Sequence, residues 1–168
     1  KQLGFSPDMI LANNAGFTTG CTDANEQLVA DKASPSITTQ ASPTTALTAG
    51  TAATVGDTAT FHNAFTPTGN VTFTLYSDNQ CSTSTGISGD GAISGNSASF
   101  SHSFTPSTAG TYYWKAHYAG DGNNNAFTTG CADANEQLTV QKTKPSIATL
   151  LSATTGAVGD TVHDSSTL

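Results

Sequence analysis

Residues 109–118, AGTYYWKAHY, carry the clearest structural signal in the sequence. Their side chains alternate between two sets, and such a period of two is typical of a strand with one buried and one outer face. The inner set is aromatic and apolar: Tyr112, Trp114, Ala116 and Tyr118. The outer set is Tyr113, Lys115 and His117. We therefore expect a strand here, with its aromatic face in the core of a small domain.

The same alternation recurs on both sides of this strand. It is found in NVTFTLYS (70–77), DTATFHNAF (57–65), SASFSHSFTP (97–106) and EQLTVQK (136–142), and PSITTQAS (35–42) is a plausible first strand. The expected inner residues are Val71, Phe73, Leu75, Ala59, Phe61, Ala98, Phe100, His102, Phe104, Leu138 and Val140. Clusters rich in Gly, Pro, Ser and Asn separate these segments and predict turns at 66–70, 88–96, 106–110 and 119–125. No segment shows helical periodicity, so the pattern predicts an all-β, antiparallel β-sandwich.

Two long stretches of the chain are nearly identical. FTTGCTDANEQL at 17–28 returns as FTTGCADANEQL at 127–138, with eleven of twelve residues unchanged and an offset of 110 residues. KASPSI at 32–37 returns as KTKPSI at 142–147. VGDT recurs at 55–58 and 158–161, now offset by 103, so the second copy is about seven residues shorter in between. A period near 110 residues suits a whole small domain rather than a solenoid repeat.

The period divides the chain into three parts. Residues 32–142 form one complete repeat, residues 1–31 correspond to the last strands of a preceding repeat, and residues 143–168 correspond to the first strands of a following one. Residues 1–15 do not match their counterparts in the complete repeat, and nothing in the sequence explains why.

The complete repeat resembles the tandem bacterial immunoglobulin-like domains of large secreted and cell-surface proteins. The residues that carry the resemblance are VTFTLYSDNQC (71–81), AGTYYWKAHYAGDGNNN (109–125) and ANEQLTV (134–140). AGTYYW is similar to the tyrosine corner of these domains, with Tyr112 as the corner residue and Trp114 in the core. The resemblance implies an immunoglobulin-like β-sandwich in tandem array, and such modules usually act as spacers.

Three cysteines follow the same period. Cys81 and Cys131 lie within the complete repeat, while Cys21 is the counterpart of Cys131 one period earlier. We predict a Cys81–Cys131 disulfide and expect the partner of Cys21 to lie outside this sequence. The alternative is a pair of free buried thiols. The pairing requires AFTTG (126–130) to lie already on the 110–118 strand, with CADANE (131–136) as a bulge in the last strand. A disulfide would indicate an extracellular location.

Composition excludes several classes of partner. The chain has five lysines, no arginine and twelve acidic residues, with a net charge of −7. Nucleic-acid binding depends on clustered Lys and Arg, so we expect none. No apolar run is long enough to predict a membrane span.

The sequence offers little catalytic chemistry. The four histidines have no metal-ligand spacing, and no nucleophile motif or Ser–His–acid grouping stands out, so an enzyme is not expected. Asp121, Asn123 and Asn125 have a spacing that can hold a hard cation through oxygen ligands, which makes them a candidate Ca²⁺ site. The alternative for these residues is a Gly- and Asn-rich turn, with no cofactor.

Two functions remain. The first is a structural repeat of an extracellular, surface-attached stalk or fibre (adhesin-like), whose partners are neighbouring repeats or identical subunits arranged end to end. Such a fibre could be one long polypeptide, or subunits completed by strands of their neighbours. The second is an immunoglobulin-like module of a surface adhesin that binds a glycan or protein, with the outward-facing Tyr113 and His117 as the candidate ligand face.

Overall fold

The structure is a computed structural model that describes residues 29–168. The chain divides into two units, residues 1–31 and residues 32–168, and every strand described below belongs to the second. The predicted strands of a preceding repeat at 1–31 thus lie almost entirely outside the described residues. So does Cys21.

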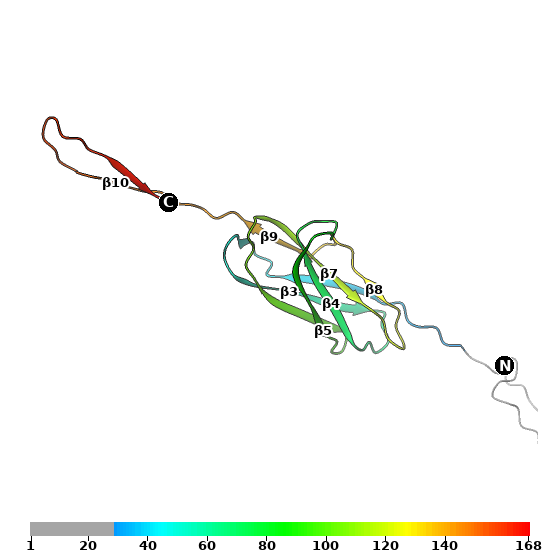
Figure 1. The fold of residues 1–168 in the computed structure, drawn as a ribbon. Helices are drawn as coiled ribbons and strands as arrows, with labels where there is room; N and C mark the ends of the chain where they lie inside the picture. Colours follow the sequence, from blue (N-terminus) through cyan, green and yellow to red (C-terminus); the bar gives the residue numbers. More distant parts are fainter. Residues whose placement is uncertain (1–28) are drawn as a thin grey trace, which may run out of the picture. The chain divides into compact units, whose positions relative to one another are not determined.

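Residues 36–141 form two β-sheets (Figure 1). The smaller sheet has the antiparallel order β1-β3-β6 and is built from β1 (Ser36–Ser42), β3 (Ala53–His62) and β6 (Ser97–Phe104). The larger sheet has the order β2-β9-β7-β4-β5, with β8 also paired to β7. Its strands are β2 (Leu47–Thr48), β4 (Asn70–Tyr76), β5 (Ser84–Ala92), β7 (Gly110–Tyr118), β8 (Phe127–Thr128) and β9 (Gln137–Gln141).

The strand that follows β1 pairs with the last strand of the sandwich, β9, at one edge of the larger sheet. The chain leaves β1 in the smaller sheet, passes a cis peptide bond between Ser42 and Pro43, and enters the larger sheet as β2. There Leu47 pairs in parallel with Val140 of β9, while the other strand pairs are antiparallel. This connectivity defines an all-β, immunoglobulin-like sandwich, as the sequence predicts.

The core lies between the inner faces of the two sheets. Val71, Phe73 and Leu75 of β4 are fully buried, as is Trp114 of β7. Phe61 of β3 packs edge-on against Tyr118 of β7, with ring centroids 5.0 Å apart and an interplanar angle of 87°. The period-two alternation therefore identified the buried faces of β3, β4, β7 and β9 correctly. On β6, His102 lies opposite Val55 in the strand register but is exposed, because β6 is the edge of its sheet.

The prediction of a turn across residues 88–96 is wrong for its first half. Residues 84–92 form β5, which pairs with β4, and the turn is confined to residues 94–97. The glycines of this strand are needed for close packing. A Cβ atom on Gly89 would lie 2.2 Å from the ring of Phe100, and one on Gly91 would lie 2.4 Å from the Ser99 carbonyl oxygen. Glycine therefore marks a close approach between the sheets here, and the turn-like composition hid a strand.

The tyrosine corner predicted from AGTYYW is present. The Tyr112 hydroxyl donates a hydrogen bond to the Thr108 carbonyl oxygen at 3.0 Å, and the Tyr112 ring packs edge-on against Phe104 at 5.2 Å. This bond fixes the loop between β6 and β7 to the start of β7.

A separate hairpin follows the sandwich in sequence. Strands β10 (Ala148–Leu151) and β11 (Asp164–Thr167) pair antiparallel, with Ala148 opposite Thr167 and Leu151 opposite Asp164. Every residue of both strands is exposed. The part of the chain that the structure describes contains no helix with the length and hydropathy needed to cross a membrane.

Replacing Tyr112 by Phe tests the tyrosine corner. The substitution keeps the ring in the core and removes the hydrogen bond to Thr108, so we expect the free energy of unfolding to fall by about 1 kcal/mol. Urea denaturation followed by tryptophan fluorescence measures the change. Tyr113→Phe, on the outer face of the same strand, is the matched control and should leave stability nearly unchanged. Equal effects of the two substitutions would contradict the role of the corner.

Candidate functional site

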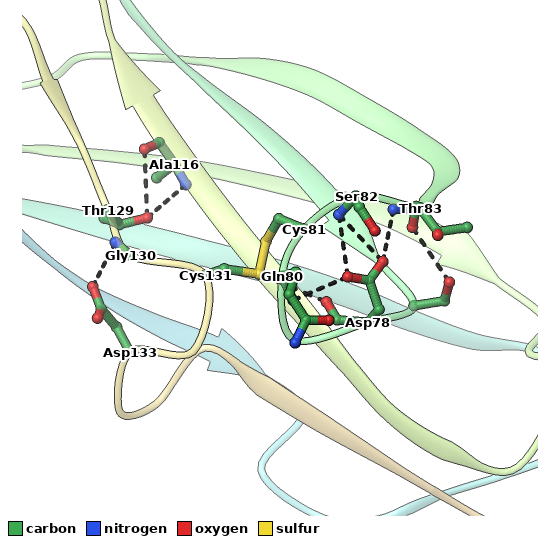
Figure 2. The surroundings of a disulfide bond; sticks show 11 residues. Asp78, Gln80, Cys81, Ser82, Thr83, Ala116, Thr129, Gly130, Cys131 and Asp133 are labelled. Carbon is green, nitrogen blue, oxygen red and sulfur yellow. Dashed lines mark hydrogen bonds between the residues drawn. A yellow bond between two sulfur atoms is a disulfide. The ribbon is translucent and has the colours of Figure 1, made fainter.

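The disulfide joins Cys81, in the loop after β4, to Cys131, in the loop before β9. Their Cα atoms are 5.6 Å apart, within the range that an unstrained backbone allows. Because β7 lies between β4 and β9 in the sheet, the bond spans β7 (Figure 2). The predicted pairing is confirmed, and free thiols are excluded for these two residues.

Cys131 reaches this position because the last strand is interrupted. Thr128 of β8 pairs with His117, and Thr129 continues this pairing with a backbone bond of 3.0 Å to the Ala116 carbonyl. The chain then bulges away and returns to β7 where the Trp114 N–H donates to the Glu136 carbonyl at 2.9 Å. The predicted bulge is therefore confirmed, and we call residues 129–136 the bulge loop.

Local hydrogen bonds shape the bulge loop (Figure 2). The Asp133 carboxylate accepts a bond of 2.7 Å from the Gly130 N–H, and the Thr129 hydroxyl accepts one of 2.9 Å from the Ala116 N–H. A Cβ atom on Gly130 would lie 2.5 Å from an Asp133 carboxylate oxygen, so a larger residue here would displace the Asp133 side chain from this hydrogen bond. The TGC…D part of the repeated sequence thus encodes a specific turn.

The other half of the disulfide sits in a turn organised by Asp78. Its carboxylate accepts hydrogen bonds from the backbone N–H groups of Gln80 at 2.9 Å, Thr83 at 2.6 Å and Ser82 at 3.2 Å (Figure 2). Burial acts to raise the pKa of Asp78, but these N–H donors outweigh it and lower the pKa to about 2. The turn holds Cys81 at a positive φ of 52°, facing Cys131.

A second organised region lies at the loop between β7 and β8. Both carboxylate oxygens of Asp121 accept hydrogen bonds, which come from Thr68, from the backbone of Asn123 and Asn124, and from the Asn124 side chain. The fully buried Asn124 amide also bonds both backbone groups of Phe65, at 2.8 and 2.9 Å. Burial acts to raise the pKa of Asp121, but the donors, with the Tyr118 hydroxyl, hold it well below its usual range.

These contacts bear on the candidate Ca²⁺ site. Asp121 is the centre of a turn, as the alternative reading of AGDGNNN holds, and the Asn125 side chain donates to the Ser34 hydroxyl at 3.2 Å. Within residues 29–168 no group of three or more His, Cys, Asp or Glu side chains is arranged to hold a metal. Calcium binding by Asp121, Asn123 and Asn125 stays a prediction.

The segment that leads into β1 is fixed to this loop. The Ala33 N–H donates to the Asn123 carbonyl at 2.8 Å, the Asn125 N–H donates to the Ala33 carbonyl at 2.9 Å, and the Lys32 ammonium bonds the Asp121 carbonyl at 2.6 Å. The KASP sequence therefore belongs structurally to the domain that follows it.

The outer face of the larger sheet carries a shallow groove. Its lining residues are Thr72, Thr74, Tyr76, Lys115, His117 and Thr128. The His117 ring bonds the Thr128 hydroxyl at 2.7 Å and is exposed, as predicted. Tyr113 pairs with Tyr76 in the register and is half-buried, and it does not line the groove.

The sequence analysis did not identify two buried carboxyl groups. Asp57 and Glu136 are both buried in the core, with exposed fractions of 2% and 0%. Both lie within repeated stretches, VGDT and DANEQL, and a carboxylate that recurs in a repeat is the signal that could have identified them.

The fold and the disulfide define a disulfide-bonded immunoglobulin-like β-sandwich domain. Among solved structures the chain is similar to a CARDB domain from Pyrococcus furiosus, whose structure is described as a complex with di-metal ions. The identity is 14%, the match covers 64% of this chain and 89% of that chain, and the TM-score is 0.38. No protein-family model matches the sequence. No curated protein matches it either.

Removing the disulfide tests its contribution to stability. In the Cys21→Ala background, Cys81→Ala/Cys131→Ala opens a loop of 50 residues, and the chain-entropy model gives a loss of about 4 kcal/mol in the free energy of unfolding. Urea denaturation measures this loss. Reduction of the Cys21→Ala protein with dithiothreitol is the matched control and should reproduce it. An unfolding free energy that reduction leaves unchanged would contradict a stabilising role.

Proposed function

We propose that this chain is a structural repeat segment of an extracellular, surface-attached stalk or fibre of the adhesin-like kind. In this proposal each domain adds length and stiffness, and residues 143–168 are the first strands of a following repeat. No catalytic role is proposed. The observation that carries the proposal is the exposure of four apolar residues between 147 and 162 whose counterparts in the complete repeat are core residues.

The sequence repeat relates these positions pair by pair. Ile147 and Leu151 correspond to Ile37 and Ala41 of β1, which are 7% and 2% exposed. Val158 and Val162 correspond to Val55 and Ala59 of β3, both fully buried. Ile147 precedes β10, Leu151 ends it, and Val158 and Val162 lie in the loop before β11. Their exposed fractions are 67%, 54%, 109% and 46%, in that order.

An isolated two-stranded hairpin is at most marginally stable in water, and exposed apolar side chains add to its cost. Residues 147–162 thus expose the apolar side chains that a complete repeat buries, although the β10–β11 pairing differs from that of β1 and β3. Leu151 lies opposite Asp164, whereas its counterpart Ala41 lies opposite Asp57, the counterpart of Asp160. The exposure of these side chains therefore supports a tandem array in which the rest of a further repeat covers them.

The connector supports stiffness. KASP and KTKP each contain a proline, which fixes one backbone angle and limits bending. The hydrogen bonds of Lys32 and Ala33 to the loop between β7 and β8 remove further freedom from the first connector. A short connector of this kind transmits orientation from one domain to the next better than a flexible linker would.

The disulfide supports the extracellular location, and the low charge supports the packing of neighbouring copies. Disulfides persist in oxidising compartments, and Cys81–Cys131 is of the structural kind, joining two loops across a central strand. The chain also carries few charges, 10% of its residues, so little repulsion opposes lateral or end-to-end packing of neighbouring copies.

The fibre proposal predicts a regular increase in length with the number of repeats. Proteins containing one, two and three copies of residues 32–142, joined through their own connectors, should show a maximum dimension in small-angle X-ray scattering that grows by a constant step. Replacing KASP by GSGS at each junction is the control, and it should shorten the average dimension by adding flexibility. Immunogold labelling of the source cells should mark extended surface structures. A dimension that does not grow with repeat number would contradict the proposal.

The alternative function is that of a glycan- or protein-binding module. The groove on the outer sheet face favours it, because Tyr76, Lys115 and His117 offer an aromatic ring, a cation and an imidazole beside three threonines. Such a mixture of one aromatic surface and several hydrogen-bonding groups suits a sugar ring.

A glycan array probed with the 168-residue chain tests this alternative. We expect Tyr76→Ala and His117→Ala to abolish any specific signal, and Thr38→Ala, on the outer face of the other sheet, to leave it intact. Signals that survive both groove substitutions would rule out this face as the binding site.

A further inference from the structure

The core of the sandwich contains two carboxyl groups that no lysine or arginine neutralises through a hydrogen bond or ion pair among the described residues. Asp57 projects from β3, in the smaller sheet, and Glu136 lies at the end of the bulge loop, against the larger sheet. In the register, Asp57 pairs with Ala41 and Ala59 pairs with Thr39, so Thr39 and Asp57 are diagonal neighbours on the inner face. The Thr39 hydroxyl donates a hydrogen bond to Oε1 of Glu136 and so connects the two sides.

In each carboxyl group only one of the two oxygens accepts a hydrogen bond. Oδ1 of Asp57 accepts the Thr58 N–H at 2.8 Å, and Oε1 of Glu136 accepts the Thr39 hydroxyl. In the described part of the chain, Oδ2 of Asp57 and Oε2 of Glu136 are buried without a hydrogen-bond partner. An ionised carboxylate with a buried, unpaired oxygen is costly, whereas a protonated carboxyl group carries no charge and has a hydrogen to donate.

The surrounding charges also favour the protonated state of these two carboxyl groups. The groups whose charge acts on Glu136 among residues 29–168 are Asp57 and Asp133, both acidic. The hydroxyls of Thr39 and Thr129 are neutral, and the other buried residues of β1 and β7 are apolar or aromatic. No cation among residues 29–168 therefore compensates two negative charges in this position.

We propose that Asp57 and Glu136 form a proton-binding site that makes the domain more stable in mildly acidic than in alkaline surroundings. The proposal concerns a single domain and is independent of the fibre function. Glu26 is the counterpart of Glu136 in the preceding copy, and Asp160 is the counterpart of Asp57 in the following copy. The proposal therefore applies to each repeat of an array.

The pKa values of the two carboxyl groups set the direction of the pH dependence of stability and the pH range in which it occurs. Burial raises the pKa of Asp57 to about 6, against the opposing effect of the Thr58 and Gln40 N–H donors. Burial, with the charges of Asp57 and Asp133, raises the pKa of Glu136 to about 7. Between the unfolded values near 4 and these folded values, the folded state binds more protons than the unfolded chain. Its stability therefore falls as pH rises through this range.

Urea unfolding of the oxidised 168-residue chain between pH 5 and pH 8 tests the proposal. We expect the folding equilibrium constant of the wild type to fall on the order of 1000-fold across this range, about tenfold through Asp57 and on the order of 100-fold through Glu136. Glu136→Gln should leave a fall of about tenfold, which is the share of Asp57, and Asp57→Asn/Glu136→Gln should be nearly flat. Asp90→Asn, which changes an exposed carboxylate on β5, is the matched control and should keep the wild-type slope.

Carboxyl-carbon NMR of the wild type gives a measurement that does not depend on the variants folding. Two side-chain carboxyl signals that titrate near pH 6 and 7 are expected. Signals that all titrate near pH 4, or a wild-type stability that is constant or rises between pH 5 and 8, would overturn the proposal. A stability at pH 8 that increases with added Ca²⁺ or Na⁺ in the wild type, but not in Glu136→Gln, would overturn it in favour of a cation site.

Discussion

The interrupted last strand is the constraint on which the rest of this domain depends. Both halves of the strand, β8 and β9, remain hydrogen-bonded to β7, while the bulge loop between them leaves the sheet. Released from the ladder, the bulge loop can place Cys131 beside Cys81 and turn Glu136 into the core. It also reaches the opposite sheet, because the Ala41 N–H of β1 donates to the Asn135 carbonyl at 2.7 Å. One irregular segment thus links both sheets and the disulfide, and an uninterrupted strand could do none of this.

The loops of the domain are fixed by side chains that replace missing backbone partners. The Asp78 carboxylate accepts hydrogen bonds from the N–H groups of the turn that carries Cys81, and the Asp121 carboxylate accepts them from the loop between β7 and β8. The Asn124 side chain bonds the backbone N–H and carbonyl groups of Phe65. The connector is bonded to the same loop through the backbone of Ala33. Rigid loops and a fixed connector are properties that a load-transmitting spacer needs, whereas a binding module needs them only around its ligand. This difference adds to the support that the exposed apolar residues at 147–162 give to the proposed structural function.

Sequence reasoning succeeded where the information is local or repeated. The alternation of AGTYYWKAHY identified β7 and its buried face, and the position of Tyr112 relative to Gly110 identified the tyrosine corner. The sequence period paired Cys81 with Cys131 and required the bulge. It failed for β5, where Gly89 and Gly91 look like turn residues but make room for Phe100 and Ser99 of the facing sheet. It also missed β2, whose two residues are too few to show a pattern.

By itself, the sequence determined the strands with clear alternation, their inner faces and the period of the repeat, because side-chain alternation and internal identity can be read without knowing what lies opposite. Only the tertiary structure decided which polar groups meet in the core. Asp57 and Glu136 are 79 positions apart in the chain, and each alone looks like an ordinary surface acid. Their approach depends on sheet packing and on the path of the bulge loop, and neither leaves a local pattern. Burial without a cation then gives these two carboxyl groups a chemistry that their residue types do not predict.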